Sequence, residues 1–79
     1  MNIDVKDILT LNDKNKYVVV SKALYEGKEY LYLIDVNNNA KVMFCYVDND
    51  KIVESNNKEL NTKLIPLFFD NIKAMLANE

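Results

Sequence analysis

Apolar and polar residues alternate with a period of about two through the first part of the chain. Val5 to Leu11 reads as a short first strand, and Tyr17 to Leu24 and Tyr30 to Val36 are rich in β-branched and aromatic residues. Between the second and third of these segments lies Gly27, the only glycine of the chain. The pattern predicts that these two segments form a β-hairpin.

The position of Gly27 bears on the register of this hairpin. A three-residue loop, Tyr25 to Gly27, needs a left-handed residue in third place, and Leu24 then faces Lys28. The expected core face in this register consists of Val18, Val20, Leu24, Tyr30, Tyr32, Ile34 and Val36. A four-residue loop shifts the pairing by one residue and moves the tyrosines of the second strand to the opposite face, so both registers stay open.

Further strands follow the hairpin. Ala40 to Val47 is predicted to be a strand that carries Val42, Phe44 and Tyr46 on one face. The turn residues Asp48 to Asp50 then lead into a short strand. We expect an antiparallel meander of four to five strands over about residues 5–54.

After Ser55 the apolar residues recur at helical spacing. The stripe consists of Leu60, Leu64, Ile65, Phe68, Phe69, Ile72, Met75 and Leu76. Asn56 or Asn57 can cap the first turn. Pro66 lies on the polar side, where it either kinks one helix of about residues 57–77 or separates two short helices. The chain is therefore predicted to be a single α+β domain over residues 1–79, with the helix packed on the sheet.

The second face of the hairpin is too apolar to be left to water. It carries Tyr17, Val19, Leu31 and Leu33. Either the sheet curls into a partial SH3-like barrel that encloses these residues, or another chain covers them. They are our candidate partner surface.

Composition favours a folded protein, because 49% of the residues are apolar and 28% are charged. The net charge is −2 and the chain has no arginine, which makes nucleic acid an unfavoured partner. The amino terminus lacks a secretory signal pattern, and no apolar run approaches the length of a membrane span. We expect a cytoplasmic protein without membrane contact.

Few residues offer catalytic or metal-binding chemistry. The chain has one cysteine and no histidine, which excludes an intrachain disulfide and the usual zinc sites, and we interpret Cys45 as a core residue. Asp48 and Glu59 match the ends of a calcium-binding loop, but Val53 stands where that loop needs glycine. We expect no metal or cofactor. Among the carboxylates, Asp35 and Glu54 could form an acid/base pair, although turn and surface positions suit them better.

Three segments resemble a known family: Ile8 to Asp13, Tyr17 to Val20, and Tyr25 to Leu33. They are similar to small bacterial proteins grouped as domain of unknown function 1292. The resemblance covers about Ile8 to Glu54 and leaves out Leu64 to Phe69. Since that family is itself uncharacterised, it implies no activity and supplies no functional residues.

Three functions fit the sequence in decreasing order. The first is a non-enzymatic protein-interaction module or homo-oligomer. The second is a small-ligand binder or minor enzyme that uses surface carboxylates and tyrosines. The third is single-stranded nucleic-acid binding, in which bases would stack on the five tyrosines.

Overall fold

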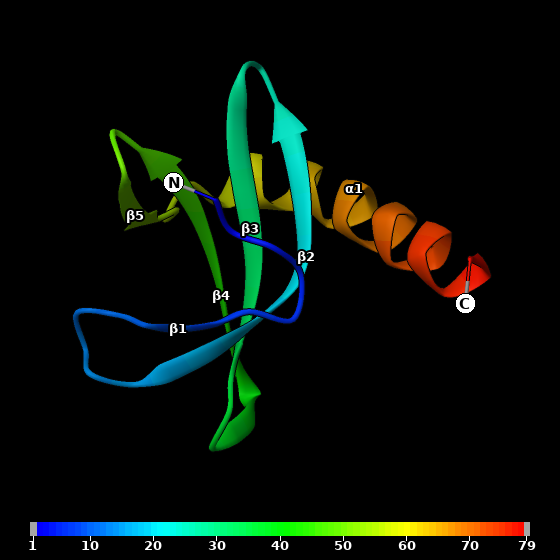
Figure 1. Ribbon diagram of the computed structural model, residues 1–79. Helices are drawn as coiled ribbons and strands as arrows, with labels where there is room; N and C mark the ends of the chain where they lie inside the picture. Colours follow the sequence, from blue (N-terminus) through cyan, green and yellow to red (C-terminus); the bar gives the residue numbers. More distant parts are fainter. Residues whose placement is uncertain (1, 79) are drawn as a thin grey trace.

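The computed structural model describes residues 2–78 and consists of one antiparallel sheet followed by one helix (Figure 1). The elements in chain order are β1 (Ile8–Thr10), β2 (Lys16–Tyr25), β3 (Lys28–Asp35), β4 (Asn38–Asp48), β5 (Lys51–Glu54) and α1 (Lys58–Ala77). Neighbours in the sheet are also neighbours in the chain. The predicted α+β class, antiparallel meander and carboxy-terminal helix are confirmed.

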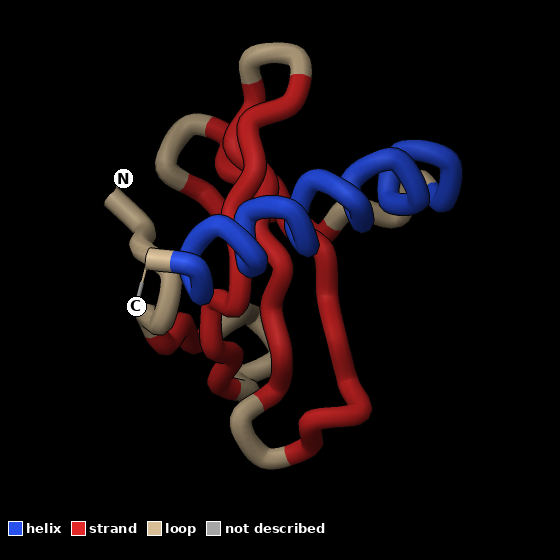
Figure 2. Tube along the Cα trace, turned by 90° about the vertical axis from the view of Figure 1, so that its right-hand side faces the viewer, coloured by secondary structure: helices blue, strands red, loops and turns tan. Residues whose placement is uncertain are grey.

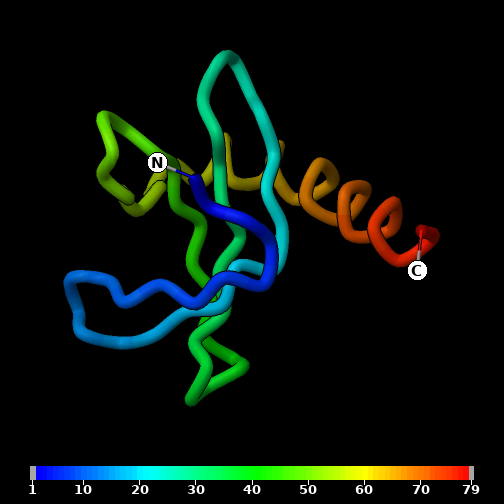
Figure 3. The backbone as a smooth tube through the Cα atoms, viewed as in Figure 1, coloured from blue at the N-terminus to red at the C-terminus, as the bar shows by residue number. Residues whose placement is uncertain are grey.

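The sheet curls into a half-barrel, with the β1–β2 hairpin folded across one side of it (Figures 1 and 3). The interior of the curl is a cluster of buried residues from the amino-terminal segment and three strands: Ile3, Tyr17, Val19, Leu31, Leu33 and Cys45. Curling thus buries the hairpin face that had no cover in a flat sheet. A complete SH3-like barrel stays a prediction.

Helix α1 packs on the opposite face of the sheet (Figure 2). Between the helix and the sheet lies a second cluster of buried residues: Ala23 and Tyr30 of the sheet, and Leu64 and Phe68 of the helix. The Phe68 ring centroid lies 5.7 Å from that of Tyr32 and 5.4 Å from that of Phe44. These aromatic contacts add to the apolar burial that fixes the helix on the sheet.

The β2–β3 turn has two residues, so the predicted three-residue loop is wrong. Tyr25 pairs with Lys28, and the turn residues Glu26 and Gly27 have φ of 49° and 80°. A turn with two left-handed residues matches the right-handed twist of the flanking strands, and this favours the tighter loop.

A bulge between Val19 and Ser21 changes the register along the hairpin. On the turn side of the bulge the pairing is shifted by one residue from the predicted one. On the far side the predicted register holds, since Val19 pairs with Leu33. Each of the two registers that the sequence left open therefore applies to one half of the hairpin.

The bulge also decides which side chains are buried. Ser21 turns toward α1, where its hydroxyl donates to the Phe68 carbonyl at 2.9 Å. Lys22 turns toward the inner face, and its Nζ donates to the Ile3 carbonyl at 2.7 Å. The predicted core face is corrected: of its residues only Tyr30 is buried, Leu24 is 75% and Val36 is 44% exposed, and the others are partly buried.

Helix α1 begins at the predicted cap, where the Asn57 side chain accepts a hydrogen bond of 3.1 Å from the Leu60 amide. The helix runs unbroken through Pro66, so two separate helices are wrong. Pro66 lies on the exposed side, where the Thr62 carbonyl that loses its helical donor can reach water. A kink at Pro66 stays a prediction. Within residues 2–78 no helix has the length and apolar character needed to cross a membrane.

Candidate interaction cleft between the edge strands

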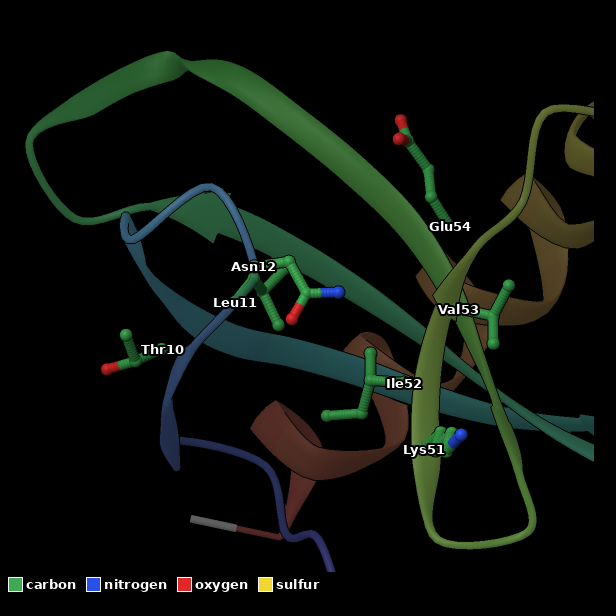
Figure 4. Close-up of a pocket in the computed structure, with 7 residues that line it drawn as sticks. All are labelled: Thr10, Leu11, Asn12, Lys51, Ile52, Val53 and Glu54. Atoms are coloured by element: carbon green, nitrogen blue, oxygen red, sulfur yellow. The ribbon is translucent and has the colours of Figure 1, made fainter.

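The open side of the half-barrel is a cleft between β1 and β5, the two end strands of the sheet (Figure 4). Its volume is about 640 Å³, and it is lined by residues of β1, β5 and the chain that follows β1: Thr10, Leu11, Asn12, Lys51, Ile52, Val53 and Glu54. In the described part of the chain, neither β1 nor β5 pairs with a second strand. The cleft therefore lies between two free strand edges.

The floor of the cleft is apolar and continuous with the interior core. A second hollow of about 240 Å³ shares Leu11 and Ile52 with the cleft and reaches Met43 and Cys45. Leu11, Met43 and Ile52 are partly buried and pack against the interior cluster. Figure 4 shows the Ile52 side chain directed into the space between the two edges. The half-barrel thus exposes one side of its core at this cleft.

Strand geometry places free backbone groups of β5 at the cleft. Asp48 and Lys51 pair across a two-residue turn with left-handed residues, so they form a hydrogen-bonded pair. Hydrogen-bonded and non-hydrogen-bonded pairs alternate along an antiparallel ladder. The amide and carbonyl of Ile52 therefore point away from β4, toward the free edge. The Ser55 amide donates to the Phe44 carbonyl at 2.7 Å, which fits the same alternation.

The same alternation holds on β1. The Leu11 amide donates to the Asn15 carbonyl at 3.1 Å and the Val19 amide to the Asp7 carbonyl at 2.9 Å. The pairs between them then place the amide and carbonyl of Thr10 on the outer edge. Both rims of the cleft consequently offer unpaired donors and acceptors.

The polar side chains around the cleft do not converge on one point. In Figure 4 the Thr10 hydroxyl is turned away from the cleft, and the Glu54 carboxylate points away from Ile52. Only the Asn12 amide extends into the space between the edges. Such a lining suits hydrogen bonding to a bound chain, whereas catalytic sites bring polar side chains together around the reacting group.

Cys45, on the floor of the second hollow, is 1% exposed. Burial, with the nearby Glu54 carboxylate as a smaller cause, raises the pKa of its thiol to about 12. The thiol is therefore protonated at neutral pH and is a poor nucleophile. Its predicted position in the core is confirmed.

A polar cluster lies beside the second hollow, where Asp13 contributes to the lining. The buried Tyr17 hydroxyl donates to Asp13 at 2.7 Å, and the Lys41 Nζ lies 3.6 Å from the same carboxylate and 5.6 Å from the Tyr17 ring centroid. The hydrogen bond from Tyr17, ahead of one from the Asn15 amide, lowers the pKa of Asp13. These contacts fasten the β1–β2 hairpin over the interior.

The candidate partner surface is not available to another chain. Tyr17, Leu31 and Leu33 are fully buried and Val19 is 1% exposed. The structure brings all four together, but inside the curl and under Ile3 rather than on a surface. Of the two alternatives that the sequence left open, a curled sheet and a covering chain, the structure has the first, and these four residues are core residues.

Asp35 and Glu54, the suggested acid/base pair, lie apart. Leu31 aligns with Cys45, which pairs with Glu54, whereas Asp35 lies four residues farther along β3. Four residues of strand span about 13 Å, so the two carboxylates share no site. Asp35 accepts a hydrogen bond from the Asn37 amide at 2.8 Å and serves the turn. Among the described residues no group of three or more metal-ligating side chains is close enough to hold an ion.

Tyrosine side chains take no part in the cleft. Four of them, Tyr25, Tyr30, Tyr32 and Tyr46, lie on the helix side of the sheet or at its margin, packed with other rings. Tyr17 is in the interior. The cleft residues were missed from sequence because no motif marks them, although free edges at both ends of a short meander are a usable signal.

Comparison with known proteins gives no relatives: the chain matches no family model, no curated protein and no solved structure.

Proposed function

We propose that the protein is a non-enzymatic interaction module that binds an extended segment of a partner protein in the cleft between β1 and β5. The observation that carries this proposal is the free edge of β5 beside an apolar floor. An added strand satisfies unpaired backbone groups and covers apolar side chains at the same time.

The dimensions of the cleft limit the ligand. Strand β5 has four residues and β1 has three. Paired strands have the same rise of about 3.3 Å per residue, so a segment that pairs along β5 is about four to five residues long. Its side chains would alternate between the floor and water, so we expect apolar residues at every second position.

An enzymatic or small-ligand function has less support. The polar side chains of the cleft point in different directions, and the Cys45 thiol is buried with a raised pKa. Nucleic-acid binding also has less support, because Tyr17 and Tyr30 are buried and the chain is acidic overall. Stacking of bases needs exposed rings beside positive charge.

Site-specific photo-crosslinking in the host cell tests the proposal. A benzophenone side chain replaces Asn12, whose amide extends into the cleft, and in a control protein it replaces Leu24, which is 75% exposed and away from the cleft. We expect a discrete crosslinked partner from position 12 only. Equal labelling from both positions, or none from position 12, would contradict the proposal.

The backbone contribution can be tested once the crosslinked segment has been made as a synthetic peptide. Cys45 allows the chain to be ligated from fragments 1–44 and 45–79, so the Ile52 amide can be N-methylated while its side chain is kept. We expect binding of the peptide to fall about tenfold or more, because one backbone hydrogen bond is lost and the methyl group blocks the edge. N-methylation at Lys58 is the control, since the first amides of a helix have no intrahelical acceptor.

A further inference from the structure

Helix α1 carries a second apolar stripe beside the one that packs on the sheet. Leu64 and Phe68 form the buried stripe. The other stripe consists of Ile65, Phe69, Ile72 and Leu76, which we call the outer seam. Ile65, Phe69 and Leu76 are 41%, 47% and 57% exposed. The intervals of four, three and four residues are those of a helix that packs along a second helix.

A groove lies next to the first half of the outer seam. It has a volume of about 200 Å³ and is lined almost wholly by apolar side chains: Tyr32, Val42, Phe44, Ile65, Phe68 and Phe69. Val42 is 50% exposed, so this part of the sheet face is not covered by the helix. Three of the large exposed apolar residues thus surround one hollow.

The second half of α1 projects beyond the sheet (Figure 1). Ile72 and Met75 are therefore only partly covered, and Leu76 is more exposed than either. The first half of the helix thus borders an apolar groove, while the second half has apolar side chains that the sheet covers only in part.

We propose that two copies of this chain associate through the outer seam, with their α1 helices antiparallel about a two-fold axis. Centred between Phe69 and Ile72, this arrangement places Leu76 of one copy beside Ile65 of the other, at the groove. Each copy thus fills the groove of the other, and such self-complementarity is the mark of a two-fold interface. The seam itself carries no charged residue, as the cores of protein interfaces prefer.

The surface area that this dimer would bury is close to the minimum for a specific protein interface. Burying Val42, Ile65, Phe69 and Leu76 in both copies removes on the order of 700 Å² of apolar surface, and a polar rim brings the total near the ~1,000 Å² that marks a specific interface. The seam spans less than two heptads, too few for an independent coiled coil, so the groove is needed. We therefore expect a dissociation constant of the dimer in the micromolar range.

Sedimentation equilibrium of the full chain over micromolar to millimolar concentrations tests the dimer. Phe69→Glu and Leu76→Glu place a charge on the seam and should each weaken association at least tenfold, whereas Leu24→Glu, also at an exposed leucine, should leave it unchanged. Both seam side chains are about half exposed, so the variants should keep the far-UV circular dichroism of the native protein. A wild-type monomer at millimolar concentration, or a dimer that the seam variants leave intact, would overturn the proposal.

The antiparallel direction has its own test. In a mixture of Ile65→Cys and Leu76→Cys proteins, oxidation should give mainly the mixed disulfide, because like positions lie about 16 Å apart along antiparallel helices. Mainly like-with-like disulfides would overturn the antiparallel arrangement. These measurements use no cleft ligand, so their failure leaves the proposed cleft function untouched.

Discussion

The Ser21 hydroxyl on β2 donates a hydrogen bond of 2.9 Å to the Phe68 carbonyl on α1, and both residues are buried. The bulge after Val19 turns Ser21 toward the helix. A one-residue irregularity in a strand thus supplies a direct polar link between the sheet and the helix, across 47 positions of sequence.

Ser21→Ala should lower the free energy of unfolding by about 1 kcal/mol, because a buried hydrogen bond is lost while the Phe68 carbonyl keeps its helical donor. Urea unfolding followed by circular dichroism measures the change. Thr62→Ala is the control, since that hydroxyl bonds the Lys58 carbonyl at an exposed position and should change stability by no more than about 0.5 kcal/mol. Equal losses in both variants would show that the Ser21 bond adds no stability.

Leu33→Ala should lower the free energy of unfolding by about 2–5 kcal/mol, because Leu33 is fully buried in the curl and its truncation leaves a cavity. Leu24→Ala removes the same atoms at a position that is 75% exposed, and should change stability by no more than about 0.5 kcal/mol. Thermal and urea unfolding of both variants measure the two losses in the free energy of unfolding. A small loss at Leu33 would mean that the curl does not enclose this face.

The Cys45 thiol gives a pH dependence with a defined sign. Its pKa is raised from 9.0 to about 12 in the folded chain, chiefly by burial, so the folded state holds the proton more tightly than the unfolded state. Its contribution to stability is therefore complete below pH 9 and is lost between pH 9 and 12, by at most about 1.4 kcal/mol per pH unit.

Urea midpoints at pH 8 and pH 10 for the wild type and Cys45→Ala measure this effect, since tyrosine and lysine titration is common to both proteins. We expect the wild type to lose more stability than the variant between the two pH values. Parallel losses would mean that the folded thiol titrates as freely as in the unfolded chain. A thiol reagent should likewise modify Cys45 slowly in buffer and quickly in urea.

The β2–β3 turn predicts stability changes of opposite sign at neighbouring positions. Gly27→Ala should destabilise the protein by about 1 kcal/mol through backbone strain alone, because φ is +80° and no atom lies within 4 Å of the added carbon. Glu26→Asn should stabilise it by about 0.5 kcal/mol, because asparagine adopts the left-handed conformation at φ 49° more readily. Thermal unfolding checks both. A neutral Gly27→Ala would argue for a turn of another type.

Local pattern alone predicts much of the fold. The alternation in Tyr17 to Val36 predicts two strands, and the stripe from Leu60 to Leu76 predicts the helix, because period-two and helical spacings depend only on which residues must leave water. Sequence also places the helix cap at Asn56 or Asn57, since a cap uses contacts within one turn, and the structure has it at Asn57. Sequence likewise assigns Cys45 to the core.

Tertiary structure decides the rest, because it depends on contacts between residues far apart in the chain. Whether Tyr17, Val19, Leu31 and Leu33 face a partner or the interior depends on how strongly the sheet curls, and alternation is the same in a flat and a curled sheet. The bulge at Val20 has no local sequence mark, yet it turns Ser21 to the helix and sets both registers. The cleft between β1 and β5 exists only because the curl stops before the two edges meet, and that closure is a property of the whole sheet.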